Sequence, residues 1–455
     1  MAYQETIQYL ESFINYEKIP DYPYKEFIKL ERVKNFLATI DNPQDSLKCL
    51  HIAGTKGKGS TCAFVAYILR QAGYSVGLYT SPHLSDFRER IRILWRQVPE
   101  DFEGMISHAE IADLVERLRP QIESYNKYSE YGALSFFEVY TSLALVYFKE
   151  KKVDFAVLET GLGGRLDATN VVNPLIAAIT PISYEHTQKL GSTLREIAAE
   201  KAGIIKSQAS GVRSQELIVI SAPQEKEVAE VIRNKCKETM SKLYEVGRDI
   251  NYIGINNDFK VKGLCVDYPN LKIKLLGEHQ LINASVAIGI IEALRSYNIN
   301  VDIGAIRGGL YNTVWPGRFE VVSSAPLIVL DGAQNIASMR ALKEAVKENF
   351  SAESAVGGKG GKYKRLILVL GISNDKDIKG ICNEIYDLAD EIVLTKADNP
   401  RATEPKELVK YFNGKVAHIT DNAKEAKELV YRICKKEDLI LVCGSLFVVG
   451  EFRNG

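Results

Sequence analysis

Short apolar segments alternate with segments of helical periodicity through most of this chain. The first strand-like runs lie at residues 48–54, 153–160, 174–180 and 217–223. Helical patterns lie at residues 59–73, 192–203 and 225–243. The second of these begins with a capping-box pair, Thr193 and Glu196. Because parallel strands need long crossover connections, this alternation predicts an α/β fold with helices on both faces of a mostly parallel sheet.

A second series of strand-like runs begins after residue 316. Its members lie at residues 326–335, 365–373, 391–397, 415–420 and 439–445. Pro316 and Gly317 stand between the two series, where they predict a hinge. We therefore expect a large α/β domain over residues 1–313 and a smaller one over 314–455. A Gly/Lys-rich surface loop is predicted at 355–364.

Charge and cysteine usage narrow the classes of function. The 455 residues include 58 basic and 58 acidic ones, so the chain lacks the basic excess typical of nucleic-acid binders. Its seven cysteines form no CxxC pair, which predicts reduced thiols and a cytoplasmic location. The N-terminal segment lacks the basic and apolar regions of a signal peptide. We expect no membrane span, because no uncharged apolar run reaches about 18 residues.

A glycine-rich turn connects the first strand-like run to the first helical pattern. The predicted nucleotide-binding turn comprises Gly54, Thr55, Lys56, Gly57, Lys58, Gly59, Ser60 and Thr61. Its glycines let backbone N–H groups approach a phosphate, and Lys58 supplies a compensating charge. The spacing departs from the usual phosphate loop, because Ile52 stands at the first glycine position and Gly59 follows the lysine. A glycine-rich turn without a ligand is the alternative, and Lys56 is equally compatible with phosphate contact and with solvent exposure.

Polar residues follow two further strand-like runs. Glu159 comes at the end of one, and His186 follows the next. Ligands of open α/β sheets collect at such strand ends, and a buried carboxylate beside a nucleotide favours Mg²⁺. Arg165 and Asp167 follow Glu159 in a glycine-containing loop and are candidates for substrate contact. Lys201 ends a helical pattern, where a solvated charge near the helix C-terminus is the simpler interpretation.

Ten short segments together resemble the Mur ligase superfamily, and within it the folylpolyglutamate and dihydrofolate synthases. The segments are GTKGKGSTCAF, TSPHL with RERIRI, FFEVYT, ETGLGGRLDATN, EHT…LG, EKAGIIK, GEHQLINA, WPGRFE, DGAQN and CGSL. They occur in the family's order over nearly the whole chain. The resemblance implies a large P-loop-type parallel-sheet ATP-binding domain and a smaller Rossmann-like C-terminal domain that binds glutamate and closes over ATP.

The same resemblance implies roles for individual residues. It implies metal ligation by Ser81, Glu159, His186 and a carbamylated Lys201, with two Mg²⁺ ions. Lys58, Glu159, His186 and Lys201 form the implied catalytic set. Asn283 corresponds to a residue near adenine, and Arg318 and Asp331 to contacts with the phosphate and adenosine of ATP. His83 joins Arg165 and Asp167 as a candidate for substrate contact, although its loop could equally border a metal.

The chain departs from the family pattern at two positions. Glu185 stands where the family usually has Asp before the histidine. Gln334 replaces the histidine of the DGAHN segment, so a charged role at this position is in doubt.

The implied reaction adds L-glutamate to the γ-carboxylate of a reduced folate through an acyl phosphate, with ATP as the driving substrate. Dihydropteroate is the alternative acceptor, in a dihydrofolate synthase that is either monofunctional or bifunctional. A nucleotide-binding switch is a remote alternative, suggested by the Thr-Lys-x-Asp segment that ends at Asp398. A folate-binding scaffold without ligase activity is another. We expect small-molecule substrates only, no nucleic acid, no membrane and a monomer.

Overall fold

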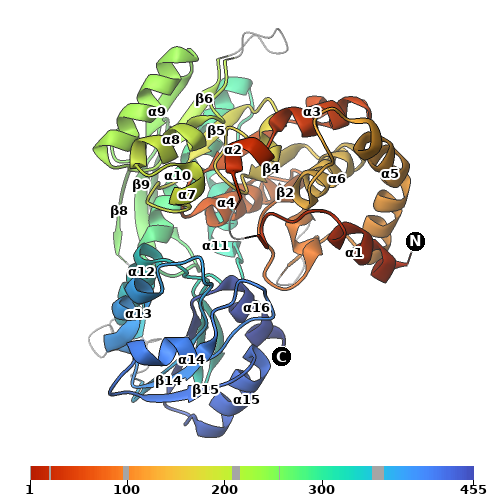
Figure 1. Cartoon of the computed structure of the whole chain (residues 1–455). Helices are drawn as coiled ribbons and strands as arrows, with labels where there is room; N and C mark the ends of the chain where they lie inside the picture. Colours follow the sequence, from red (N-terminus) through yellow and green to blue (C-terminus); the bar gives the residue numbers. More distant parts are fainter. Residues whose placement is uncertain (1, 20–21, 96–101, 208–215, 256, 351–362) are drawn as a thin grey trace.

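The computed structural model describes residues 2–19, 22–95, 102–207, 216–255, 257–350 and 363–455. These residues form two bodies, one above the other in Figure 1. The segments coloured red to green form the upper body, and the blue C-terminal segments form the lower one. Each body has its own mostly parallel sheet covered by helices, which confirms the predicted α/β class.

Seven strands form the first sheet, in the order β3-β2-β4-β1-β5-β6-β7. They are β1 (Cys49–Ala53), β2 (Val76–Tyr79), β3 (Ile91–Leu94), β4 (Phe155–Glu159), β5 (Ile176–Ile179), β6 (Ile218–Ser221) and β7 (Lys242–Glu245). All neighbours pair in parallel except β3, which is antiparallel to β2. β1, β4, β5 and β6 are buried throughout, as expected for apolar strands covered on both faces. Their carboxyl ends therefore lie side by side at one edge.

Helices cover both faces of this sheet. One face packs against α4 (Lys58–Gln71), α10 (His279–Ala293) and α11 (Ile303–Asn312). The other packs against α3 (Leu30–Ala38), α5 (His108–Tyr128), α6 (Phe136–Glu150), α8 (Leu194–Ala202) and α9 (Lys226–Glu238). The other α-helices of this body are α1 (Tyr3–Glu11), α2 (Tyr24–Phe27) and α7 (Thr187–Leu190). The sheet is thus the middle of three layers.

A small antiparallel sheet adjoins α10 and was not predicted. Its strands are β8 (Asn251–Ile255), β9 (Asp258–Lys262) and β10 (Asp267–Lys272), in the order β10-β9-β8. Phe259, Val261, Tyr268 and Leu271 bury its inner face in the same core as α4 and α10. The alternation of buried and exposed side chains along β9 is typical of a sheet with one face in water.

Six strands form the second sheet, in the order β11-β12-β16-β13-β14-β15. They are β11 (Glu320–Ser324), β12 (Leu327–Leu330), β13 (Leu366–Leu370), β14 (Glu391–Leu394), β15 (Val416–Ile419) and β16 (Leu439–Cys443). Only β11 pairs in an antiparallel way. The helices that cover its two faces are α12 (Ile336–Phe350) with α13 (Ile378–Ile385), and α15 (Ala423–Ile433) with α16 (Leu446–Asn454). α14 (Pro405–Leu408) is a single turn.

Short 3-10 helices complete the described elements. They are η1 (Pro43–Ser46), η2 (Phe87–Arg90), η3 (Ala168–Val171), η4 (Leu294–Tyr297), η6 (Tyr386–Leu388) and η7 (Val409–Tyr411). Among the described residues, no helix has the length and apolar character needed to cross a bilayer.

The predicted strand-like runs all contain strands of the two sheets, and the Thr193–Glu196 capping box is confirmed. The helix predicted over residues 225–243 was too long, because α9 ends at Glu238 and β7 begins at Lys242. Met240 interrupts the helix with a positive φ of 54°. Most of the predicted 355–364 loop lies outside the described residues. The domain division at 313/314 stays a prediction.

Candidate active site

The glycine-rich turn after β1 (residues 54–61, the predicted phosphate loop) is a tight loop at the carboxyl edge of the first sheet. Gly54 and Gly57 have φ values of +149° and +80°, which side chains rarely tolerate. A Cβ at Gly54 would lie 1.9 Å from Thr180 Oγ1, and one at Gly57 would lie 2.1 Å from the Asn283 side chain. Glycine is therefore required at both positions, and Asn283 lies directly over the loop.

Part of this loop is held by the strand beside it. The backbone N–H groups of Thr55 and Lys56 donate to Pro181 O at 3.1 and 3.2 Å. These two N–H groups are therefore occupied within the protein. The first-turn N–H groups of α4, which begins at Lys58, remain as the natural anion donors of the loop. Burial lowers the pKa of Lys56, and the charge of Glu185 only partly offsets that effect.

Lys58 and Glu159 meet across the two central strands. Lys58 Nζ lies 3.9 Å from Glu159 Oε1. Glu159 Oε2 accepts a hydrogen bond of 3.2 Å from the backbone N–H of Ser81. Burial raises the pKa of Glu159, whereas Lys58 and the Ser81 N–H act in the opposite direction. The structure thus brings together three predicted site residues: Lys58 at the start of α4, Ser81 after β2 and Glu159 at the end of β4.

Lys201 is a buried lysine at the end of α8, so the interpretation as a solvated helix-end charge was wrong. Its side chain reaches the phosphate loop, and Nζ donates to Gly54 O at 2.7 Å. Burial, followed by repulsion from Lys58, lowers its pKa to about 7. A large fraction of its amine is therefore neutral near pH 7, which is the form that can add CO₂ to give a carbamate.

His186 and Glu185 lie on the loop after β5. Burial lowers the pKa of His186 to about 4, although Glu185 partly offsets this effect, so the imidazole is neutral at pH 7. Burial acts to raise the pKa of Glu185, but His186, Lys58 and neighbouring lysines outweigh it and keep the carboxylate charged. Glu185 Oε1 accepts a hydrogen bond of 3.3 Å from Asn335 Nδ2. This contact connects the two bodies of the molecule.

The metal-ligand chemistry of the site fits Mg²⁺ beside a phosphate. In the described part of the chain, no three His, Cys, Asp or Glu side chains gather into a metal-binding group. Mg²⁺ commonly uses only one or two carboxylates together with phosphate oxygens and water, and Glu159 supplies one carboxylate. Thr61 Oγ1 is buried and has no hydrogen-bond partner among the described residues. Such an orphaned hydroxyl is suited to a metal or a phosphate oxygen.

Arg318 and Asp331 belong to the second body, and the charge of Arg318 acts on the carboxyl groups of both Glu159 and Asp331. Asp331 accepts hydrogen bonds of 2.8 Å from the backbone N–H groups of both Phe319 and Ala333. Arg318 Nη1 donates to Gly317 O at 3.2 Å. A Cβ on Gly332 would lie 2.4 Å from the same Nη1 atom. Their contacts with a nucleotide stay predictions.

The three predicted substrate residues are all engaged inside the protein. Arg165 is largely exposed and pairs with Glu200 at 2.8 Å. Asp167 accepts from the Leu162 N–H at 2.8 Å and from the Thr169 hydroxyl at 2.6 Å. His83 Nδ1 accepts from the guanidinium of the buried Arg90 at 2.9 Å. Only Asp167 lines the cavity described next, and all three roles stay predictions.

A cavity lies between the two bodies, next to these residues. Its lining from the first body includes Tyr16, Glu17, Tyr22, Tyr24, Ile28, Ser81, Ser135, Phe137, Glu138, Asp167 and His186. The second body contributes Gln334, Lys376, Arg401, Leu446 and Phe447. The lining thus combines aromatic side chains of the first body with cations of both bodies, and the two kinds are interspersed, since Lys189 Nζ lies 4.1 Å from the centre of the Tyr22 ring. Gln334 belongs to this lining in place of the usual histidine.

Lys376 and Arg401 were missed by the sequence analysis. Each follows the carboxyl end of a strand in the second sheet, β13 and β14 respectively. The strand-end rule that singled out Glu159 would have found both. Asp375 Oδ2 lies 3.5 Å from Lys376 Nζ and from Arg401 Nη1, so the two cations share one carboxylate.

This fold and site define a Mur ligase. The Mur ligase middle domain matches residues 126–291, and the Mur ligase glutamate ligase domain matches residues 317–446. The chain belongs to the dihydrofolate synthase and folylpolyglutamate synthase family, as the following similarities show, and this confirms the resemblance seen in the sequence.

The similarities cover nearly the whole chain. It is 33% identical to dihydrofolate synthase/folylpolyglutamate synthase of Bacillus subtilis, over 93% of this chain and 94% of that protein. The Escherichia coli protein of the same name is 32% identical, over 93% of this chain and 90% of that protein. Folylpolyglutamate synthase of Mycobacterium tuberculosis complexed with ADP superposes with a TM-score of 0.86 at 28% identity, over 99% and 97%. Escherichia coli FolC in complex with DHPP and ADP superposes with a TM-score of 0.81 at 30% identity, over 100% of this chain and 97% of that one.

Proposed function

We propose that this protein is an ATP-dependent ligase that joins L-glutamate to the γ-carboxylate of a reduced folate, releasing ADP and phosphate. The observation that carries the proposal is the cavity between the two bodies. Its lining combines aromatic side chains with cations from both bodies, and it includes Ser81, whose backbone N–H donates to Glu159 beside Lys58. This composition suits a flat aromatic acceptor that carries a carboxylate.

The nucleotide is assigned to the loop after β1. Lys58 and the first-turn N–H groups of α4 compensate the charge of the β- and γ-phosphates. Arg318 approaches the phosphates from the second body, whereas Asn283 and Asp331 face the adenosine. Relatives with ADP or AMPPCP bound support ATP as the nucleotide.

Mg²⁺ is assigned to Glu159 and Ser81, with Thr61 offering its unpaired hydroxyl. A second ion is assigned to His186 and a carbamylated Lys201. When bound, Mg²⁺ would neutralise charge on the phosphates and the acceptor carboxylate.

The reaction has two steps. A carboxylate oxygen of the acceptor attacks the γ-phosphorus of ATP, ADP leaves, and an acyl phosphate forms. The neutral α-amine of glutamate then attacks the acyl carbon, phosphate leaves, and the amine loses a proton as the amide forms. The chain's own contribution is to orient the reactants and to stabilise developing negative charge, chiefly through Lys58.

The incoming glutamate is assigned to Lys376 and Arg401. Its two carboxylates need cations, and these side chains present two in the lining of the cavity. Because both belong to the second body, glutamate binding would couple to closure of the two bodies.

Dihydropteroate is the second candidate acceptor, since related proteins carry both names. A nucleotide switch is disfavoured, because the Thr395–Asp398 segment follows β14 of the second sheet, whereas the phosphate loop follows β1 of the first. Lys396 of that segment also pairs with Glu404 at 2.8 Å. A scaffold without activity is disfavoured by the preserved Lys58–Glu159 contact.

Product analysis by mass spectrometry tests the assignment. Purified protein is given ATP, Mg²⁺ and L-glutamate with either tetrahydrofolate or dihydropteroate. We expect ADP release and an added glutamate on at least one acceptor, and the acceptor used separates the two synthases. Absence of ADP release with both acceptors would refute the ligase.

All seven cysteines are free, which supports a reducing cytoplasmic location. A monomeric state stays a prediction.

A further inference from the structure

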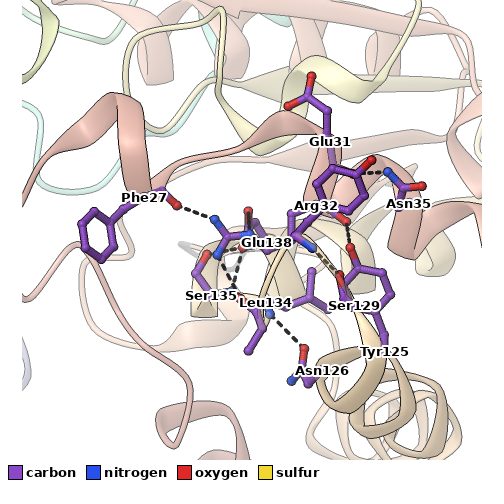
Figure 2. Close-up of polar contacts among 12 residues, drawn as sticks. Phe27, Glu31, Arg32, Asn35, Tyr125, Asn126, Ser129, Leu134, Ser135 and Glu138 are labelled. Atoms are coloured by element: carbon purple, nitrogen blue, oxygen red, sulfur yellow. Dashed lines mark hydrogen bonds and ion pairs between the residues drawn. The ribbon is translucent and has the colours of Figure 1, made fainter.

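Part of the apolar lining of the cavity comes from two chain segments that are distant in sequence. Tyr24 and Ile28 come from the segment around α2, whereas Phe137 comes from the first turn of α6. Arg32 of α3 lies between these segments, with its side chain directed at Glu138 (Figure 2). The Arg32 and Glu138 side chains are only 8% and 6% exposed.

The guanidinium of Arg32 contacts both segments at once. Nη2 donates to the carbonyl oxygen of Phe27, at the end of α2. Nη1 donates to Ala133 O at 2.9 Å, in the loop that leads into α6. Nε lies 3.4 Å from Glu138 Oε1 (Figure 2). Nε makes no hydrogen bond among the described residues, so Arg32 joins the two segments through two hydrogen bonds and attracts Glu138 by charge. A planar guanidinium fixes its donors in one geometry, which an ammonium group cannot do.

Glu138 is held equally firmly. Its Oε2 accepts from Ser135 N at 2.7 Å and from Ser135 Oγ at 2.8 Å, which forms the capping box of α6. Helix capping does not require a buried arginine, because α5 has the same capping box from Ser107 and Glu110 at the surface. The buried cation behind the cavity lining therefore does something beyond capping.

We propose that Arg32 is a positioning residue for the acceptor, which fixes Tyr24, Ile28 and Phe137 as the wall against which a flat heteroaromatic ring packs. The proposal rests on the function proposed above. Arg32 does not contact the phosphate loop, so its effect is confined to the acceptor. An aromatic wall that shifts by a fraction of an ångström loses contact area with the ring and leaves ATP binding unchanged.

Two variants test this role. Arg32→Lys keeps the charge and removes the fork. The double variant Arg32→Met/Glu138→Gln removes both charges, so no unpaired charge is left in the core. We expect the Kd and KM of the preferred acceptor to rise about tenfold or more in both variants, with ATP Kd and kcat within about twofold of the unmodified protein. Arg117→Ala is the matched control, because it breaks an exposed arginine pair with Glu150.

The readouts are equilibrium binding of tetrahydrofolate, dihydropteroate and ATP, steady-state kinetics, and the thermal midpoint. Unchanged acceptor affinity in the folded variants would overturn the proposal. So would a parallel loss of acceptor affinity, ATP affinity and thermal stability, because that indicates a general structural role. If the unmodified protein binds neither acceptor, the proposed function fails and this inference with it. If it binds an acceptor and the variants bind equally well, only the inference fails.

Discussion

Lys201 Nζ donates a hydrogen bond of 2.7 Å to the backbone oxygen of Gly54, the first glycine of the phosphate loop. This contact joins the end of α8 to the loop after β1 and places a second lysine within the electrostatic influence of Lys58. The amine is therefore held against the glycine-rich loop with a depressed pKa.

Carbamylation of Lys201 has a pH signature. Because its pKa is about 7, the reactive neutral amine becomes more abundant as the pH rises through 7. We expect activity to fall in CO₂-depleted buffer and to recover on addition of bicarbonate, faster at pH 8 than at pH 6. Lys201→Gln should show low activity and no response to bicarbonate. Equal activity of the unmodified protein with and without CO₂ would exclude a required carbamate.

Replacing Lys58 should slow the reaction. Lys58→Met removes the charge that compensates the transferred phosphoryl group and leaves Glu159 without its partner at 3.9 Å. We expect kcat to fall about 100-fold or more, measured by ADP release. Lys226→Ala, on the surface of α9, serves as a control with no expected effect. A Lys58→Met variant with near-normal kcat would remove this loop from the chemistry.

Glutamate recognition should depend on the two cations of the second body. Lys376→Ala and Arg401→Ala each remove one cation from the cavity. We expect the KM for L-glutamate to rise about tenfold or more in each, with the KM for ATP unchanged. Lys396→Ala is the control, because this lysine pairs with Glu404 at the surface of the same body. If only the KM for ATP rises, the two residues contribute to nucleotide binding and not to glutamate binding.

His51 should make the fold sensitive to acid. It is fully buried, with Nε2 2.8 Å from Thr169 Oγ1. Burial and then the charge of Lys206 lower its pKa to about 3, from 6.5. Between these values the unfolded chain binds a proton that the folded chain does not, so stability falls as the pH falls below 6.5.

The slope contributed by His51 is at most about 1.4 kcal/mol per pH unit. His51→Gln should therefore be less sensitive than the unmodified protein to a decrease from pH 6.5 to pH 4.5, in denaturant unfolding at several pH values. Parallel stability profiles for the two proteins would contradict this assignment.

Local sequence determined β1, β4, β5 and β6 of the first sheet and β12 to β16 of the second, together with the glycine turn and the Thr193–Glu196 capping box. Each depends on periodicity or on contacts within a few residues, which a linear pattern records directly. The end of α9 was misjudged, because the helical pattern continues past Glu238 while tertiary pairing draws Lys242 into β7. The helix propensity of a segment is a weak effect, and strand pairing with a neighbouring element can outweigh it.

The site itself required both kinds of information. The residues at the strand ends could be named from the sequence, because parallel strands must deliver their carboxyl ends to one edge. The tertiary structure alone decided that Lys201 is buried against Gly54, that Lys376 and Arg401 face the same cavity, and that Arg32 links Phe27 to Ala133. Burial and long-range contacts set these charges and positions, and residues more than 100 positions apart leave no local pattern that records their meeting.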